Sequence, residues 1–267
     1  MNEKTISRRS LLKLASASTV TAAAVLPSAA RAAQAVQWDE TYEIIVVGAG
    51  GAGMAAAVKA AQKGAKHVVV LEKLNFPGGN TLISQGFINA ADPVRQPKQG
   101  IKDSWQHHAE QTLEAGDFRG QKDRVDVLCR NAYPTIEWLE SLGMQFKPKV
   151  IQIFGALYPR SHVPALPKGQ GYGTVLSKAA KELGVEVRTG MGVEEIIREK
   201  PFEGDVLGVV AKNAKGEIKR IRATRGVVLA AGGFSANKYL RELHDPRVAG
   251  LGTDNLPGAT GEVAMAA

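Results

Sequence analysis

Residues 42–73 constrain the fold of this chain more than any other part of the sequence. The stretch contains four β-branched residues in a row, 44–47, a run too short for a helix and apolar enough for a buried parallel strand. Gly48, Gly50 and Gly53 follow in the spacing G-x-G-x-x-G. In this pattern the first glycine permits a tight turn and the second lets the backbone approach a pyrophosphate. The third lets the next helix pack closely on the strand.

A helix and a second strand are predicted directly after these glycines. Residues 54–62 are rich in alanine, and a helix there would point N–H groups and its positive dipole end at a phosphate. Gly51 and Ala52 lead into this helix and belong to the predicted site. The second β run, 67–71, ends at Glu72, about twenty residues beyond the motif, where an acid can accept hydrogen bonds from the hydroxyls of an adenosine ribose.

The order of strand, glycine motif, helix, strand and acid predicts a dinucleotide site. The motif alone occurs in many turns, so a βαβ unit that binds no ligand is the alternative. Glu72 would repel a 2′-phosphate, which argues against a 2′-phosphorylated cofactor. Lys73, next to this acid, is included among the predicted cofactor-binding residues.

The charge of the chain does not indicate a nucleic-acid partner. The formal net charge is +8, but residues 1–32 hold five of the 34 lysines and arginines and one of the 26 acids. The remaining 29 basic and 25 acidic residues are nearly balanced, with no basic cluster interleaved with aromatic residues. We therefore expect no nucleic-acid binding.

The single cysteine, Cys129, limits the redox chemistry available to this chain. One cysteine excludes an internal disulfide, a cysteine-based metal or iron–sulfur site and a C-x-x-C-H haem attachment, and we predict no metal site. Cys129 lies in an amphipathic stretch and is expected to be a buried small hydrophobic residue. Any electrons must then come from another molecule.

The first 32 residues resemble a bacterial twin-arginine signal peptide. Arg8 and Arg9 precede a modestly apolar run, 14–30, which closes with the small-x-small pattern of residues 30–32. The run is too short and too interrupted to anchor the chain stably in a bilayer. This resemblance implies export of a folded protein by the twin-arginine machinery and a periplasmic location; a basic N-terminal tail is the alternative.

Residues 75–91 carry a more specific resemblance. The G-G-N-T segment with Gly79, Asn80 and Thr81, followed by Gly86 and then Asn-Ala-Ala at 89–91, resembles the flavin loop of the fumarate reductase and succinate dehydrogenase flavoprotein family. The most similar branch is the soluble one of flavocytochrome c fumarate reductases and urocanate reductases. The resemblance implies FAD, with Asn80 and Thr81 near the flavin and Gly86 allowing close backbone approach.

The same resemblance implies that FAD is held noncovalently. Members in membrane complexes attach FAD through a histidine at the position of Asn80, and an amide cannot form that bond. Phe87 departs from the family pattern, which usually has a glycine there.

The middle of the chain predicts helices and a stabilising polar segment. Residues 102–114 and 122–142 show helical spacing, and the second helix has an apolar stripe, composed of Val125, Leu128, Ala132, Ile136 and Leu139. Arg160, Ser161 and His162 resemble a recurrent family segment. A hydrogen-bonding role in the fold is favoured for them, with reception of a carboxylate as the alternative.

The last hundred residues complete the predicted fold. A helix at 171–183 and a strand at 185–188 precede three β segments, at 193–198, 204–211 and 218–223, which predict an antiparallel meander. Residues 226–234 predict a buried strand that ends in a second glycine turn, with Ala231 and Gly232 against the FAD diphosphate. By resemblance, Val193 meets the adenine, and Glu262, in P-G-A-T-G-E, faces FAD.

Together these features predict an α/β fold, a Rossmann-type FAD-binding domain of the glutathione-reductase kind with an inserted antiparallel β-meander, over residues 40–267. The resemblance places the clamp domain and the last flavin-domain segment beyond residue 267. We therefore expect an incomplete FAD-binding domain, truncated and inactive alone, and assign no catalytic residue.

The resemblance implies a reductase that transfers hydride from FAD to the C=C bond of a small unsaturated carboxylate such as fumarate. Its electrons would come from an external donor such as a periplasmic cytochrome. A non-catalytic flavin-binding module and an NAD-dependent dehydrogenase are the alternatives.

Overall fold

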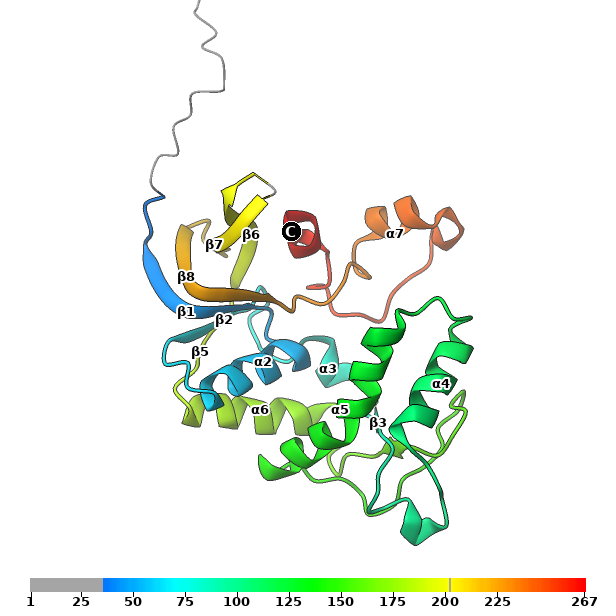
Figure 1. Ribbon diagram of the computed structural model, residues 1–267. Helices are drawn as coiled ribbons and strands as arrows, with labels where there is room; N and C mark the ends of the chain where they lie inside the picture. Colours follow the sequence, from blue (N-terminus) through cyan, green and yellow to red (C-terminus); the bar gives the residue numbers. More distant parts are fainter. Residues whose placement is uncertain (1–35, 202) are drawn as a thin grey trace, which may run out of the picture. The chain divides into compact units, whose positions relative to one another are not determined.

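A computed structural model describes residues 36–201 and 203–267, and residues 38–267 form one compact unit (Figure 1). The predicted signal peptide at 1–32 lies outside the described residues. In the part of the chain that is described, no helix combines the length and apolar character needed to cross a membrane.

A six-stranded mixed sheet organises this unit. Its strand order is β5 (Glu186–Arg188), β2 (Val68–Leu71), β1 (Glu40–Val47), β8 (Ile218–Leu229), β7 (Glu203–Asn213) and β6 (Met191–Lys200). The first four strands run parallel to one another, with Ile45 opposite Val69 on one side and Val227 on the other. The last three strands form the antiparallel meander. The predicted α/β architecture is confirmed.

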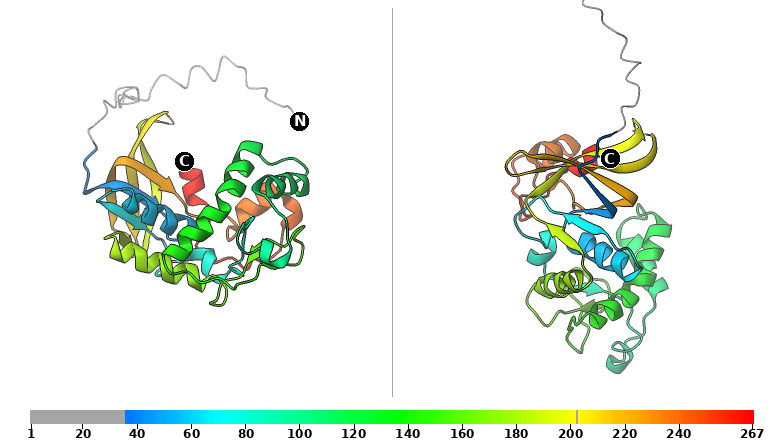
Figure 2. Two further views of the ribbon diagram at one scale, coloured as in Figure 1. Left: turned by 60° about the horizontal axis from the view of Figure 1, so that its bottom comes forward. Right: turned by 90° about the vertical axis from the view of Figure 1, so that its left-hand side faces the viewer.

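The meander is not a separate insertion, because its third strand continues into the parallel sheet. The segments predicted at 218–223 and from 226 onwards form one twelve-residue strand, β8. The prediction that its second part is buried was wrong, because Val228 and Leu229 are 37% and 44% exposed. A register shift in its pairing with β1, between Tyr42 and Ile44, accommodates the residues between the two segments. The same strand thereby connects the two parts of the sheet, and β6 and β7 rise away from the parallel strands in Figures 1 and 2.

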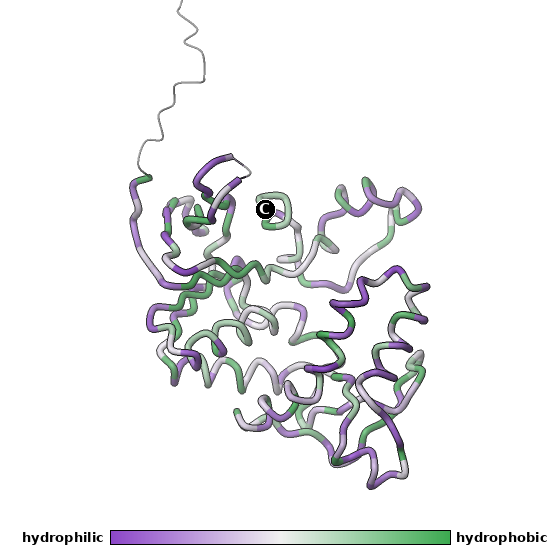
Figure 3. The backbone as a smooth tube through the Cα atoms, in the orientation of Figure 1, coloured by the Kyte–Doolittle hydropathy of each residue, from purple (hydrophilic) through white to green (hydrophobic). Residues whose placement is uncertain are grey.

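The alternation of side chains along β1 and β2 builds a core on each face of the sheet. Val46 and Val70 face the helices α2 (Gly51–Gln62) and α6 (Gln170–Glu182), where they pack with Val58 and other buried residues. Their neighbours Ile45 and Leu71 pack against the meander on the other face. Hydrophobic colouring follows the central strands, whereas the outer helices alternate (Figure 3).

A second layer of helices covers a small two-stranded sheet. The helices α4 (Trp105–Ala115) and α5 (Lys122–Ser141) pack on each other, and β3 (Ile88–Asn89) pairs antiparallel with β4 (Ser161–His162). The remaining elements are α3 (Gly79–Ile83), the 3-10 turns η2 (Pro97–Gln99) and η3 (Pro246–Val248), α7 (Lys238–His244) and α8 (Glu262–Ala266).

The buried stripe of α5 differs from the predicted one by part of a turn. Leu128 is 63% exposed, so its place in the stripe was wrong, and Cys129 lies in the core instead, 2% exposed. The buried positions on α5 are Cys129, Ala132, Ile136 and Leu139. The predicted burial of the cysteine is confirmed.

Arg160 and His162 hold the second layer together. The guanidinium of Arg160 donates two hydrogen bonds to the Asp103 carboxylate, with Nε–Oδ2 at 2.6 Å and Nη2–Oδ1 at 2.9 Å. His162 is fully buried, with Nε2 at 2.8 Å from Asp92 Oδ2. Gln96 connects the Asp103 carboxylate with the Asp92 backbone, since its NH₂ group donates to Asp103 and its amide oxygen accepts from the Asp92 N–H. The predicted stabilising role is confirmed.

Replacing Ser104 with alanine should destabilise the unit by about 1 kcal/mol. The Ser104 hydroxyl caps α4 by accepting a hydrogen bond from the His107 N–H at 3.1 Å. Urea unfolding should show this loss for Ser104→Ala, and Ser104→Asn, which can also cap, should stay close to wild type. Equal stability of all three proteins would contradict the assigned cap.

Candidate functional site

The two predicted glycine turns meet where the parallel strands β1 and β8 end. Gly48 has a φ of +100°, and a Cβ atom on it would lie 2.5 Å from the carbonyl oxygen of Ala230. The Gly48 N–H donates to Leu71 and the Ala230 N–H donates to Val47, each at 2.8 Å. The carboxyl edge of the sheet thus brings residues more than 180 positions apart into contact.

The third glycine of the motif sets how closely α2 approaches the first turn. A Cβ atom on Gly53 would lie 1.9 Å from the Gly48 carbonyl oxygen, a distance that real Cβ atoms do not adopt. The first backbone hydrogen bond of α2 runs from the Met54 N–H to the Gly50 carbonyl. The N–H groups of the preceding first turn therefore have no partner within the helix and face the end where an anion would sit.

Glu72 braces the glycine turn from the second strand. Its side chain is buried, and its carboxylate accepts hydrogen bonds from the N–H groups of Ala49 and Leu74, each at 2.8 Å. One carboxylate oxygen serves each donor, and each oxygen keeps a further lone pair. Glu72 therefore supports the loop and can still accept hydrogen bonds from a ligand.

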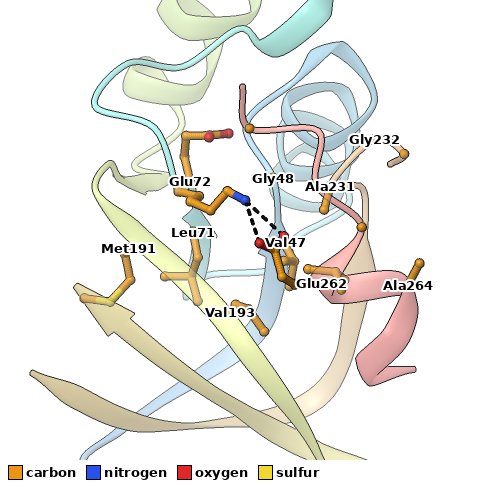
Figure 4. Close-up of a pocket in the computed structure, with 15 residues that line it drawn as sticks. Val47, Gly48, Leu71, Glu72, Met191, Val193, Ala231, Gly232, Glu262 and Ala264 are labelled. Atoms are coloured by element: carbon orange, nitrogen blue, oxygen red, sulfur yellow. Dashed lines mark hydrogen bonds and ion pairs between the residues drawn. The ribbon is translucent and has the colours of Figure 1, made fainter. Parts of the chain in front are cut away.

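Two adjoining cavities open at this edge of the sheet and share Gly48, Glu72, Ala231, Gly232 and Gly258. Figure 4 shows the first cavity, in which Leu71, Met191 and Val193 form an apolar wall below Glu72. Lys73 and Glu262 also line it. This half has the apolar surface and the acid that an adenosine would require.

Lys73 and Glu262 connect two distant segments across the first cavity. The Lys73 ammonium lies 3.0 Å from Glu262 Oε2, and Thr260 Oγ1 contacts both side chains. Burial raises the pKa of Glu262, but hydrogen bonds from Thr260 and Lys73 outweigh it and hold the pKa below its usual range. Glu262 is therefore ionised at neutral pH, and the ion pair joins the start of α8 to the end of β2.

The second cavity is lined by the helix α2 start and by the G-G-N-T segment. Gly50, Gly51 and Ala52 contribute from the first side, and the second side comes from Gly79, Asn80 and Thr81. The Thr81 hydroxyl accepts a hydrogen bond from the Gly51 N–H at 3.0 Å. The two loops are therefore held together directly.

Asn80 anchors the far segment of the chain. Its amide nitrogen donates to Asn255 Oδ1 at 2.5 Å, and its amide oxygen accepts from the Leu256 N–H at 2.8 Å. Leu256 also lines the second cavity. Both ends of the Asn80 amide are occupied by this segment, which runs into Pro257–Glu262.

The cavities fit a dinucleotide at the two points where its phosphates would approach. A Cβ atom on Gly50 or on Gly232 would meet nothing within 4 Å, although both glycines line a cavity. The absent side chains leave space beside the first turn of α2 and beside the second glycine turn. Such a cradle suits a pyrophosphate between an adenosine and a second ring system.

Two predicted residues, Gly53 and Gly86, line neither cavity, and Gly86 lies away from the glycine turns. A Cβ atom on Gly86 would lie 2.3 Å from the Lys168 carbonyl oxygen. The Gly86 carbonyl accepts a hydrogen bond from the Tyr172 hydroxyl at 2.7 Å. In this structure Gly86 serves close packing of protein backbone, and its contact with a flavin stays a prediction.

Sequence reasoning did not identify Met191, Thr260 and the 255–256 segment as parts of the site. Met191 precedes the predicted Val193 by two positions on the same strand, so the period of two could have indicated it. Asn255 gives no comparable signal, because its partner Asn80 lies 175 positions away.

Replacing Glu72 with glutamine should lower the free energy of unfolding by about 1–3 kcal/mol. The amide has one acceptor oxygen, so its NH₂ group would face either the Ala49 or the Leu74 N–H, donor against donor. Urea unfolding of the apoprotein measures this loss. Glu110→Gln, an exposed substitution on α4 with the same change in charge, should stay within about 0.5 kcal/mol of wild type; an equal effect of both would contradict the bracing role.

The comparisons with known proteins agree with this geometry. The FAD binding domain family matches residues 43–267. An acrylate reductase flavoprotein subunit of Shewanella woodyi is 31% identical over 270 residues, which cover 98% of this chain and 53% of the relative. A urocanate reductase of Eggerthella lenta is 38% identical over 225 residues, which cover 82% of this chain and 36% of the relative. The chain thus spans about half or less of these two curated relatives.

Solved structures show the same fold. A flavocytochrome c3 fumarate reductase in its open conformation superposes with a TM-score of 0.79 at 31% identity, over 85% of this chain and 40% of that one. A 3-ketosteroid-Δ4-(5α)-dehydrogenase of Rhodococcus jostii superposes with a TM-score of 0.77 at 28% identity, over 88% and 55% of the two chains. The chain belongs to the FAD-binding-domain family, among the relatives of the fumarate, urocanate and acrylate reductase flavoproteins.

Proposed function

We propose that this chain is the FAD-binding portion of a flavoprotein reductase that saturates the C=C bond of a small unsaturated carboxylate. The observation that carries the proposal is the pair of adjoining cavities, with both glycine turns and the Glu72 carboxylate at their junction. The relatives named for acrylate, urocanate and fumarate support the substrate class.

Each half of the cradle has a distinct task in this proposal. Glu72 accepts hydrogen bonds from the ribose, and Val193 and Met191 contact the adenine. The first turn of α2 and the turn at Gly232 hold the pyrophosphate with backbone N–H groups. Bound FAD would supply the hydride, and this chain orients it.

Noncovalent attachment of FAD is part of the proposal. The side chain at position 80 is an amide, and both of its ends bond to the 255–256 segment. It therefore acts as a tether between the G-G-N-T segment and the chain before α8, and Thr81 holds the start of α2.

The proposals about export and about the electron donor are drawn from the sequence. The paired arginines and small-x-small pattern within residues 1–32 support export by the twin-arginine route to the periplasm. These 267 residues contain one cysteine and no C-x-x-C-H, so they themselves supply no electron relay built from cysteine ligands. We propose that an external carrier such as a periplasmic cytochrome delivers the electrons.

The test uses the natural gene product at its full length, purified under native conditions. It should carry flavin that denaturation releases into solution, and anaerobic reduction followed by acrylate, urocanate or fumarate should reoxidise that flavin. Reoxidation by at least one of the three acids is expected. Bound flavin that none of them reoxidises would favour a non-catalytic flavin-binding module, and protein that contains no flavin and binds NAD would favour the dehydrogenase alternative.

A further inference from the structure

A third cavity lies in the second layer of the fold and shares no lining residue with the two cofactor cavities. One face of α4 lines it through His108, Gln111 and Thr112, in the spacing i, i+3, i+4. Asn89 of β3 and Arg160, just before β4, close the other side. Its lining contains no aspartate or glutamate.

The hydrogen bonds of two amide side chains leave donors available in this cavity. Gln111 Oε1 accepts from Arg160 Nη1 at 2.6 Å, and since a guanidinium can only donate, the orientation of this amide is determined. Asn89 Oδ1 accepts from the Ser161 hydroxyl at 2.6 Å. Among the described residues neither NH₂ group has a hydrogen-bond partner. Both groups can therefore donate hydrogen bonds to the acceptor atoms of a ligand.

Arg160 adds a fixed guanidinium, whose positive charge is paired with the Asp103 carboxylate. It is 4% exposed, and its bidentate pairing with Asp103 holds the guanidinium plane in place. One Nη1 N–H bonds to Gln111, and the other has no partner among the described residues. Burial, and then the charge of Arg160, lower the pKa of His108, so its ring is neutral at pH 7.

His108 also leaves a polar atom unused. Its Nδ1 is buried and has no hydrogen-bond partner in the part of the chain that the structure describes. Buried polar atoms are nearly always paired, so an orphan beside a polar cavity indicates a missing partner. The residues that line the cavity therefore supply two amide NH₂ groups, a guanidinium and a buried atom without a partner among the described residues.

We propose that this third cavity binds a small carboxylate, whose oxygens accept hydrogen bonds from the amides of Gln111 and Asn89 beside the Arg160 guanidinium. Charge-assisted hydrogen bonds of this kind are stronger than neutral ones. The site goes beyond the proposed reductase function, because it shares no lining with the cofactor cavities and its occupation requires no turnover.

The test titrates ¹⁵N-labelled natural protein, purified with whatever cofactor it retains, with sodium acrylate and follows the side-chain amide signals of Gln111 and Asn89 by NMR. Both signals should shift saturably. Acrylamide, which has the same skeleton without the charge, should bind at least about tenfold more weakly. Absence of a saturable shift with acrylate, or equal binding of acrylamide, would overturn the proposal.

Two variants test the donors themselves. Gln111→Glu keeps an acceptor for Arg160 but replaces the NH₂ donors with a negative oxygen, so acrylate affinity at this site should fall at least tenfold, read on the Asn89 amide. Asn89→Asp likewise keeps an acceptor for the Ser161 hydroxyl and removes the NH₂ donors. Its acrylate affinity, measured from the Gln111 amide signal, should also fall at least tenfold. Gln106→Glu, on the exposed side of α4, carries the same charge change and should bind like wild type. Unchanged acrylate binding in a folded Gln111→Glu or Asn89→Asp protein would contradict the assignment of these amides as donors.

Discussion

Gly50→Val should fold and yet lose FAD affinity by at least about 100-fold. Gly50 has a φ of −72°, which any residue adopts, and a Cβ atom there would meet no protein atom within 4 Å. The added isopropyl group would instead fill the space beside the first turn of α2, where the pyrophosphate is proposed to lie. A fluorescence titration of apoprotein with FAD measures the effect.

Gly226→Val is the matched control. Gly226 also has open space around its Cβ position and lies in β8, but it lines neither cofactor cavity. This variant should keep both its stability and its FAD affinity. If a folded Gly50→Val protein bound FAD with wild-type affinity, the pyrophosphate could not lie beside Gly50.

Gly53→Ala should destabilise the fold by about 3 kcal/mol or more. The new methyl group would lie 1.9 Å from the Gly48 carbonyl oxygen, which is backbone at the end of a buried strand and cannot move aside without shifting α2. The glycine turn and the helix start would separate, so FAD binding should weaken as well. Urea unfolding of the apoprotein measures the first effect.

Gly50→Ala is the control, because it makes the same glycine-to-alanine change in the same motif without the steric clash. Its methyl group has open space on the protein side, so the stability of the apoprotein should stay within about 1 kcal/mol of wild type. Equal stabilities of Gly53→Ala and Gly50→Ala would show that the third glycine is not needed for close helix packing.

The first βαβ unit could be predicted from sequence because its signals are local. Four β-branched residues, three spaced glycines and the terminal acid Glu72 lie within about thirty positions, and strand β1, helix α2 and strand β2 follow in that order. The burial of Cys129 was also predicted correctly, from the general preference of a free cysteine for the core and not from the apolar stripe, which left it out.

Other features depend on contacts that sequence spacing does not report. Strand β8 was divided in the prediction because Thr224 and Arg225 interrupt its apolar pattern, whereas pairing with β1 through a register shift makes it continuous. Leu128 was misplaced because the buried residues of α5 follow Cys129, Ala132 and onwards, one position later. A stripe in a twenty-residue helix has more than one plausible phase until its partners are known.

Some residues of the candidate site could likewise be predicted from local sequence, and others could not. The glycines and Glu72 were found from the motif, whereas the hydrogen bonds of Asn80 to the 255–256 segment join residues about 175 positions apart. The resemblance to a flavin loop placed Asn80 in the site without indicating that its amide would be occupied by protein. The tether is a result of tertiary structure.

Competition for FAD by its two halves tests the central assignment most directly. The cavities shared by both glycine turns are assigned to the adenosine diphosphate half, so ADP should displace FAD from the apoprotein saturably, and riboflavin should displace it at least tenfold less effectively. Displacement by riboflavin with no effect of ADP would mean that the two glycine turns and Glu72 do not hold the adenosine diphosphate of the cofactor.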